Sequence, residues 1–454
     1  MTAGGVRKAW VLSSVLVLIA GTAATWIYFG GPAFSVLRFA DQFGNLLALV
    51  GLAGFVAMIA LGTRFPWVER ILGLDRVYRI HKSLGVVVLS IFIGHALLRT
   101  LDYSLKHSNG RGWSFLFYFS TKDTPLLLGH IAFYILIIVI PIAIWGRHRI
   151  SFWLWKYSHL LVYPAVAVGV THAWLEQGKH FVSMPNLMLF VPVAGALVFL
   201  SVYRLMVRVR LVRQATWQVA ELVRETGDTT TLVLARPEGP GPFANRRAGQ
   251  FAIIRVRDGG RWSEPHPFTI SAPPHSDTLH FTIKAAGRFT SAIPSLAPGT
   301  QVLCEGPYGV FSVDFRKEKD IVMISGGVGI TPFLSSIRHA IRTSADSRIV
   351  LFCCNRSYDD IIARDELSSA AGLLQLKVVH VLSKVPEGGF PAGGSGVVFE
   401  GGHINGEIIA KHAPSAEASF YLCGPPPMQD AVLRALEDKL GVPPSRVRRE
   451  LFFY

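Results

Sequence analysis

The chain has 454 residues, of which 50% are hydrophobic and only 17% are charged. That length allows about three domains, and soluble proteins carry about a quarter charged residues. The composition therefore excludes an ordinary cytosolic enzyme and predicts a membrane protein with a soluble part. The formal charge of +15 suits membrane lipid and an anionic dinucleotide as partners. The sequence has no basic stripe interleaved with aromatic residues, so no nucleic acid is expected to bind.

Six hydrophobic stretches of about 20 residues, each long enough to cross a bilayer, fill the first half of the chain. They lie at 10–29, 43–61, 77–98, 126–145, 152–174 and 187–206. Arg7 and Lys8 precede the first stretch as in a signal peptide, but no convincing cleavage site follows, so we expect a retained helix. Arginines and lysines gather at alternate ends of the stretches, which predicts a multi-pass protein of the inner or plasma membrane with both termini cytoplasmic.

Two of these stretches each carry a pair of histidines. His81 and His95 lie in one, and His159 and His172 lie in the other. At about 1.5 Å rise per residue, the members of a pair lie roughly 20 Å apart along a helix, one toward each side of the membrane. Titratable residues at membrane depth are costly and usually functional. One imidazole from each helix at each depth matches the axial ligands of two stacked haems.

The spacing leaves alternatives open. His81 and His95 are fourteen residues apart, which returns to nearly the same helical face. His159 and His172 are thirteen residues apart, which misses that face by about 140° on a straight helix. Pro164 can kink the helix between them. Each histidine is otherwise a polar residue hydrogen-bonded between helices, which is our interpretation for His130. Arg99, one turn beyond His95, either meets a haem propionate or an anionic oxygen species, or reaches toward lipid as an interfacial arginine.

After residue 213 the pattern changes to short strands separated by turns, which predicts a small antiparallel β-barrel. Strands are expected in 216–235, 250–256, 279–283 and 302–304. The barrel holds the segment His266-Pro267-Phe268-Thr269-Ile270-Ser271 and, later, a turn that runs from Lys284 to Ser291. An aromatic ring, hydroxyls and backbone donors can hold a flavin ring and its pyrophosphate. An ordinary strand followed by a turn is the alternative.

From residue 317 strands alternate with helices, which predicts a parallel sheet covered by helices. Strands are expected at 321–324, 348–354, 376–382 and 419–422. The first runs into the sequence GGVGITP, whose glycines let a dinucleotide phosphate approach the backbone and a helix N-terminus. Arg356 follows the second strand, where it either binds a ribose 2′-phosphate or is an ordinary surface arginine. The last strand ends at Cys423.

All four cysteines lie in this second half of the chain, and none belongs to a C-x-x-C motif. We therefore expect neither a zinc site nor an iron–sulfur cluster. Cys304, Cys353 and Cys354 are interpreted as buried structural thiols in a reducing compartment.

The motifs HPFTIS, GGVGITP and CGPPPM, followed by a terminal aromatic group, resemble the ferredoxin–NADP reductase superfamily. With six spans and two histidine pairs before them, nearly the whole chain resembles bacterial members of the ferric reductase and NADPH oxidase family. The resemblance implies a six-helix transmembrane di-haem domain at 1–210, an antiparallel β-barrel FAD domain at 214–316 and an α/β parallel-sheet NAD(P)H domain at 317–454.

The same resemblance implies roles for individual residues. The implied FAD-binding residues are His266, Pro267, Phe268, Thr269, Ser271, Lys284, Gly287, Thr290 and Ser291. The implied nucleotide-binding residues are Gly326, Gly327, Gly329, Thr331, Pro332 and Arg356, with Cys423, Gly424 and Pro425 beside the nicotinamide. Phe452 is expected to stack on the flavin and to yield to the nicotinamide. Phe453 and Tyr454 extend past it, so the identity of the stacking ring stays open.

The activity implied by the resemblance is electron transfer from cytosolic NAD(P)H, through FAD and two b-type haems, to an extracytoplasmic acceptor. Arg99 stands where family oxidases carry a histidine, so we favour a ferric chelate over O₂ as that acceptor. The sequence has no calcium-binding loop of EF-hand form. The alternatives are a superoxide-producing oxidase, a haem-free anchor whose flavoprotein serves a cytosolic partner such as ferredoxin, and a bundle whose histidines relay protons.

Overall fold

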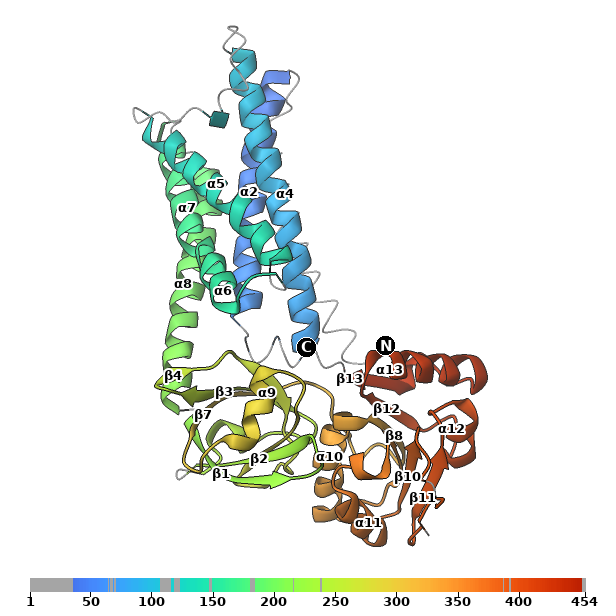
Figure 1. Ribbon diagram of the computed structural model, residues 1–454. Coiled ribbons are helices and arrows are strands. Elements are labelled where there is room, and N and C mark those ends of the chain that lie inside the picture. The colour runs from blue at the N-terminus through green and yellow to red at the C-terminus, as the bar shows by residue number, and fades with distance from the viewer. Residues whose placement is uncertain are drawn as a thin grey trace. The chain divides into compact units, whose positions relative to one another are not determined.

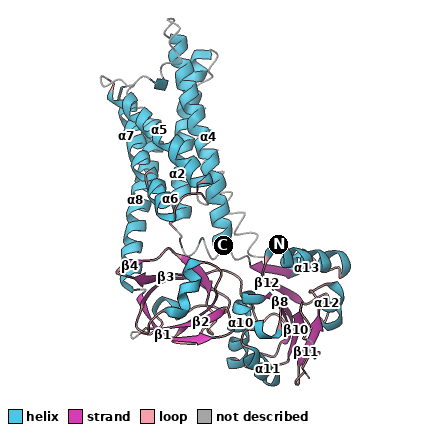
Figure 2. Ribbon diagram, viewed as in Figure 1, coloured by secondary structure: helices cyan, strands magenta, loops and turns pink. Residues whose placement is uncertain are grey.

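The structure is a computed structural model. It describes residues 36–450 apart from 64, 66–67, 69–70, 107–115, 118–122, 147–148, 180–183, 215, 237–238, 387 and 392. The chain divides into two compact units, Met1–Val209 and Arg210–Tyr454. Helices make up the described part of the first unit, and all the described strands belong to the second (Figure 2). The division of the second unit into separate domains at 214–316 and 317–454 stays a prediction.

The first unit is built from helices that are apolar over most of their length. They are α2 (Val36–Gly62), α4 (Leu74–Lys106), α5 (Thr124–Trp145), α6 (Phe152–Leu160), α7 (Val162–Lys179) and α8 (Met184–Gln214). Three stretches are long and apolar enough to cross a membrane, namely Phe43–Gly62, Arg76–Lys106 and Thr124–Trp145. The helices predicted at 43–61, 77–98 and 126–145 are therefore confirmed. The stretch at 10–29 lies outside the described residues.

The segment predicted at 152–174 is helical but interrupted, as Pro164 indicated, because the structure has two helices there. α6 ends at Leu160 and α7 begins at Val162. Proline has no backbone N–H to donate, and its ring collides with the carbonyl group four residues earlier in a regular helix. For Pro164 that carbonyl belongs to Leu160, so the chain breaks one turn before the proline and between the two histidines of this segment.

Glycines allow close approach of the helices in this unit, as they do in many membrane bundles. A Cβ atom added at Gly54 of α2 would lie 2.6 Å from Cγ2 of Val88 in α4. Gly129 of α5 faces the ring of His172 in α7, where an added Cβ atom would lie 2.8 Å from Cε1. Figure 1 shows the two resulting helix pairs, α2 with α4 and α5 with α7.

The second unit begins with an antiparallel sheet. Its strands are β1 (Thr216–Arg224), β2 (Thr229–Ala235), β3 (Phe251–Asp258), β4 (Arg261–Trp262), β5 (His266–Thr269), β6 (Leu279–Lys284) and β7 (Gln301–Tyr308). The order is β4-β3-β7-β1-β2-β6, with β5 paired to β3. The short helix α9 (Arg288–Ala292) follows β6. The predicted antiparallel sheet is confirmed, while its closure into a full barrel stays a prediction.

A parallel six-stranded sheet completes this unit, as predicted. Its strands are β8 (Asp320–Gly326), β9 (Arg348–Asn355), β10 (Leu376–Leu382), β11 (Val397–Gly401), β12 (Ser419–Cys423) and β13 (Val447–Glu450). The order is β11-β10-β9-β8-β12-β13, and α10 (Thr331–Arg342), α11 (Arg364–Leu373), α12 (Gly406–His412) and α13 (Pro426–Arg434) connect the strands. β8 and β12 are neighbours, with Ser325 opposite Cys423. Parallel strands end at one edge, so this register places the turns after β8 and β12 side by side.

Candidate functional site

His81 of α4 and His159 of α6 face each other in the first unit, with their ring centroids 6.3 Å apart and their planes at 69°. Two histidine–metal bonds of about 2 Å, plus about 1.2 Å from each nitrogen to its ring centre, add up to roughly 6.4 Å. The separation of these two rings therefore fits one metal ion held between them. Trp155, one helical turn before His159, stacks parallel to the His159 ring at 5.6 Å.

Three of the four histidines share a hydrogen-bonding arrangement. The Nδ1 atoms of His81, His95 and His172 lie 3.2, 2.7 and 2.7 Å from the backbone carbonyl oxygens of Met58, Gly44 and Pro125. A carbonyl oxygen can only accept, so Nδ1 carries the proton and donates it. Nε2 is then left with its lone pair, which is the state of a histidine that binds a metal.

His159 differs from the other three histidines. Its Nδ1 atom is buried and has no hydrogen-bond partner among the described residues. His95 and His172 are close enough for a charge on one to act on the other. The structure thus places His81 and His159 face to face, as their matched depth predicted, whereas direct contact between His95 and His172 stays a prediction.

Two arginines lie near the two pairs in different electrostatic settings. Arg204 of α8 is near His81 and His159, and its guanidinium donates to the hydroxyl of Tyr163. Its hydrogen-bond partner is thus a hydroxyl rather than a carboxylate. Arg99, one turn after His95, pairs with Asp41 of α2 and lies 3.7 Å from Asp102.

Asp102 is 3% exposed and also pairs with Lys106 at 2.8 Å. The two acidic and two basic side chains beyond His95 therefore balance in charge. Asp41 was not predicted as a partner of Arg99, because an ion pair between two helices leaves no spacing signal. Asp102 was missed although its spacing from Arg99 and Lys106, three and four residues along one helix, is a signal of ion pairing.

The predicted flavin motif lies on β5 at the edge of the antiparallel sheet. The ring of His266 stacks on Phe289 at 4.0 Å and 17°, and Phe268 lies 6.2 Å from the same phenyl ring. Phe289 lies within the second FAD segment, Lys284–Ser291, so the two predicted segments meet through these rings. The sequence analysis did not assign Phe289 a role, although it stands inside the GRFTS segment. Burial lowers the pKa of His266, against the opposing effect of Glu264, so its ring is neutral at pH 7.

Other predicted FAD residues already have partners within the protein. Lys284 pairs with Asp228 at 2.9 Å. The Thr290 hydroxyl accepts the N–H groups of Ala286 and Gly287 and thus shapes the turn before α9. Ser271 is fully buried, with its hydroxyl 3.1 Å from that of Thr282. Gly287 and Ser291 are exposed on the turn.

The turn after β8 packs directly against the turn after β12. A Cβ atom added at Gly329 would lie 2.7 Å from the carbonyl carbon of Cys423, and one added at Gly326 would lie 2.7 Å from Cδ of Pro425. Gly327 has φ +52°, which favours glycine. Thr331 and Pro332 are buried at the start of α10. The GGVGITP and CGPP motifs therefore form one backbone-lined surface at the carboxyl edge of the sheet.

Cys423 contributes backbone rather than a reactive thiol to this surface. Its side chain is fully buried, and burial, together with Glu450, raises the pKa of the thiol well above its usual value. Gln429 of α13, which the sequence analysis missed, donates to the carbonyl oxygens of Gly424 and Glu450, each at 2.8 Å. It thus joins the nicotinamide motif to the chain just before residues 451–454, among which the predicted stacking residue Phe452 lies outside the described residues.

Arg356 is exposed immediately after β9 ends. Its carbonyl oxygen accepts the backbone N–H of Lys384 at 2.8 Å, and that bond holds the loops after β9 and β10 together. Its guanidinium has no hydrogen bond or ion pair to the described residues, so it is available to an anionic ligand.

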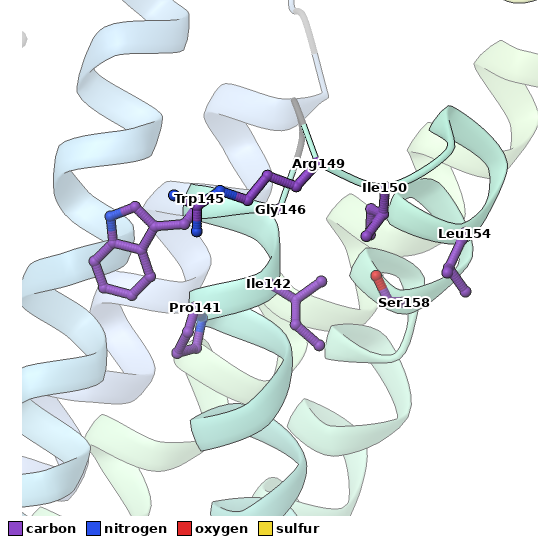
Figure 3. A pocket seen from close by; sticks show the side chains of 8 residues that line it. All are labelled: Pro141, Ile142, Trp145, Gly146, Arg149, Ile150, Leu154 and Ser158. Carbon is purple, nitrogen blue, oxygen red and sulfur yellow. The ribbon is translucent and has the colours of Figure 1, made fainter.

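A cavity of about 420 Å³ lies apart from all these residues, at the ends of α5 and α6 (Figure 3). Its walls are almost entirely carbon. It is lined by Pro141, Ile142, Trp145, Gly146, Arg149, Ile150, Leu154 and Ser158. None of the predicted cofactor residues lines it.

Three family models match the chain in succession. Residues 47–170 match a ferric reductase like transmembrane component, residues 214–312 match an FAD-binding domain, and residues 323–434 match an oxidoreductase NAD-binding domain. Together they cover His81, His95 and His159, the antiparallel sheet and most of the parallel sheet, whereas His172 and β13 lie outside the matched ranges.

Curated relatives match the second unit. NADH-cytochrome b5 reductase 1 of Eremothecium gossypii is 35% identical over 230 residues, which are 48% of this chain and 77% of that protein. The flavohemoprotein of Bacillus subtilis is 26% identical over 236 residues, which are 52% of this chain and 58% of that protein. The chain spans 58% to 66% of the length of the first three curated relatives. The FAD/NAD-binding domain of the Vibrio cholerae nitric oxide dioxygenase is 21% identical, with a TM-score of 0.44, over 52% of this chain and 98% of that one.

The two sheets are thus an FAD-binding module followed by an oxidoreductase NAD-binding module. The N-terminal helices of the chain match a ferric reductase like transmembrane component, and three of them are long and apolar enough to cross a membrane. The three matched modules, in this order, make up the ferric reductase and NADPH oxidase-like architecture.

We expect Gly329→Ala to weaken NAD(P)H binding at least about tenfold, because a methyl group there overlaps the Cys423 carbonyl and must push the two turns apart. The dissociation constant for NADPH, from nucleotide titration of the purified full chain, measures the change. Gly372→Ala, where an added Cβ atom meets nothing within 4 Å, is the matched control and should bind normally. Equal binding by both variants would contradict the contact between the two turns.

We also expect the folded chain to resist thiol reagents at pH 8. Burial raises the pKa of Cys304, Cys353 and Cys423, so the reactive thiolate is scarce until the pH exceeds those raised values. Colorimetric thiol titration should find all four cysteines after denaturation and less than about one in the folded chain. Rapid loss of one equivalent from the folded protein, mapped to Cys423, would contradict its burial.

Proposed function

We propose that this protein carries electrons from NAD(P)H on the cytoplasmic side of a membrane to an acceptor on the far side. The route would use one FAD and two b-type haems, with His81 and His159 holding the inner haem and His95 and His172 the outer one. The single observation that carries the proposal is the 6.3 Å separation of the inner rings. The shared Nδ1-to-carbonyl bonds, which leave Nε2 available, support it.

The proposal includes the predicted topology. Six helices would cross the inner or plasma membrane, with both termini in the cytoplasm. The antiparallel sheet would close into the FAD barrel of a domain at 214–316, and the NAD(P)H domain would occupy 317–454. Three sufficiently long apolar helices and the ferric reductase-like match support the membrane part.

Each protein group has a defined task in this proposal. The turn at Gly326–Gly329 and Thr331 at the start of α10 would bind the pyrophosphate of NAD(P)H through backbone donors. Pro332, which has no N–H to donate, would fix the first turn of that helix. Arg356 would bind a 2′-phosphate and so favour NADPH. Cys423, Gly424 and Pro425 would place the nicotinamide. The cysteine would act through its backbone, because the raised pKa of its thiol leaves no thiolate.

The flavin would lie against the first sheet. His266, Pro267, Phe268 and Thr269 would hold its ring. Lys284, Gly287, Thr290 and Ser291 would hold its phosphates, and Ser271 would support the motif from within the sheet. Phe452 would cover the ring until the nicotinamide displaces it. When bound, FAD accepts a hydride and returns electrons singly, and haem iron carries one electron at a time.

The acceptor in this proposal is a ferric chelate. Arg99 is paired with Asp41 and is close to Asp102. Its positive charge is therefore already compensated and would not stabilise superoxide formed from O₂. Arg204, whose partner is a hydroxyl, is a described cation near His81 and His159 that would bind a carboxylate of the inner haem. Superoxide production is the second outcome that the acceptor experiment resolves.

For the haems, we expect the purified full chain, produced with sufficient porphyrin, to show a bis-histidine b-type spectrum with two haems per FAD. His81→Leu or His159→Leu should reduce this to about one haem, since each removes one axial ligand of the inner site. His130→Gln is the control within the same unit and should keep both. A flavin-only spectrum in the wild-type chain would reject the electron route and leave a membrane-anchored flavin reductase.

For the acceptor, we expect NADPH-driven reduction of a ferric chelate to proceed under anaerobic conditions. Formation of a ferrous–ferrozine complex by the full chain in lipid vesicles measures this activity. In air, reduction of cytochrome c that superoxide dismutase abolishes would instead identify O₂ as the acceptor. That signal without ferric-chelate reduction would overturn the ferric reductase assignment.

A further inference from the structure

We propose that Arg338 is a positioning residue for hydride transfer, because it ties the end of the flavin motif to the helix that begins at the nucleotide turn. This inference rests on the proposed function. In the step concerned, a hydride leaves C4 of the nicotinamide, NAD(P)H is oxidised to NAD(P)⁺, and the flavin ring gains the hydride with its two electrons. The rate of such a step depends steeply on the distance between donor and acceptor.

Arg338 lies on α10, two turns after the nucleotide turn ends. Its Nη1 atom donates to the carbonyl oxygen of Ser271 at 2.8 Å, and Ser271 follows the flavin-motif residue Thr269 by two positions. Its Nε and Nη2 atoms form a bidentate ion pair with Glu366 of α11, with both bonds at 2.6 Å. The Glu366 carboxylate thus fixes the orientation of the guanidinium group, and the remaining donor, Nη1, points to the backbone carbonyl of Ser271.

Two neighbours on the same face of α10 make parallel connections. The hydroxyl of Ser335, buried at 2% exposure, donates to the carbonyl of Ala272 at 2.9 Å. The ring of His339 lies 3.0 Å, nitrogen to nitrogen, from that of His275. Positions 335, 338 and 339 share one helical face. This face therefore contacts the loop after the flavin motif at three positions, Ser271, Ala272 and His275.

The same loop is held from its other side by Arg246. This side chain is 4% exposed, and its Nη2 atom donates to the carbonyl oxygens of Pro273 at 2.6 Å and Ser276 at 2.9 Å. Buried carbonyl groups outside a sheet need such donors. The segment between Ser271 and Ser276 is therefore a rigid connection rather than a free linker, and movement of α10 is transmitted to the flavin strand.

The test is anaerobic stopped-flow reduction of FAD in the full chain, with NADPH and with NADPH deuterated at the transferred position. Arg338→Ala should slow flavin reduction by about 10- to 100-fold and alter the size or temperature dependence of the isotope effect. The dissociation constant for NADPH should stay within about twofold. Arg338→Lys keeps one donor toward Ser271 and should recover part of the rate.

Arg348→Ala is the matched control. Arg348 makes the same bidentate pair, with Asp320, but at the start of β9, the opposite edge of the sheet from the nucleotide turn. It should leave the rate and the isotope effect unchanged. If Arg338→Ala fails to retain FAD, Ser335→Ala, which removes only the Ala272 bond, should give the same change in isotope effect on a smaller scale.

The outcomes separate the two proposals. A wild-type flavin that neither NADPH nor NADH reduces would overturn the proposed function. A wild-type flavin that is reduced, with variants at 338 and 335 that match the Arg348 control in rate and isotope effect, would overturn the positioning role alone. A lowered unfolding temperature with an unchanged isotope effect would reduce Arg338 to a structural residue and would also overturn it.

Discussion

The cost of burying an unpaired polar group shapes the helical unit of this protein. An imidazole placed among apolar helices is costly unless its nitrogens find hydrogen-bond partners. His81, His95 and His172 each find one in a backbone carbonyl of a neighbouring helix. Because the carbonyl can only accept, the bond fixes both the tautomer and the direction of the ring. The helix pairs that glycine packing creates therefore also orient the unprotonated Nε2 atoms of these three histidines.

The need of buried backbone carbonyl groups for hydrogen-bond donors also shapes the second unit. Long side chains supply donors where no strand or helix does so. Arg246 donates to carbonyl groups of the loop after the flavin motif. Gln429 donates to the carbonyl groups of Gly424 and Glu450. The site is consequently made of backbone held in place by a few buried side chains, and few of its groups titrate near neutral pH.

Much of this arrangement is readable from the sequence, because motifs on strand ends have local signatures. GGVGITP and CGPPPM were placed correctly at the ends of β8 and β12 by glycine content and by the strand before each. The interruption of the fifth helix was only hinted at, since Pro164 signals a distortion without saying whether a helix bends or ends. The residues that were missed share a cause. Asp41, Phe289, Arg338 and Gln429 act through contacts between distant segments, which no local pattern records.

The interruption after Leu160 separates the two histidines of that segment mechanically. His81 and His95 lie on one continuous helix, whereas His159 and His172 lie on α6 and α7. α6 is only 9 residues long and is anchored by the Trp155 indole, which donates to the Ala143 carbonyl at 3.1 Å. A strain on α6 can thus be absorbed at the break, so that a substitution in this short helix changes the geometry around His159 while His172 on α7 keeps its own.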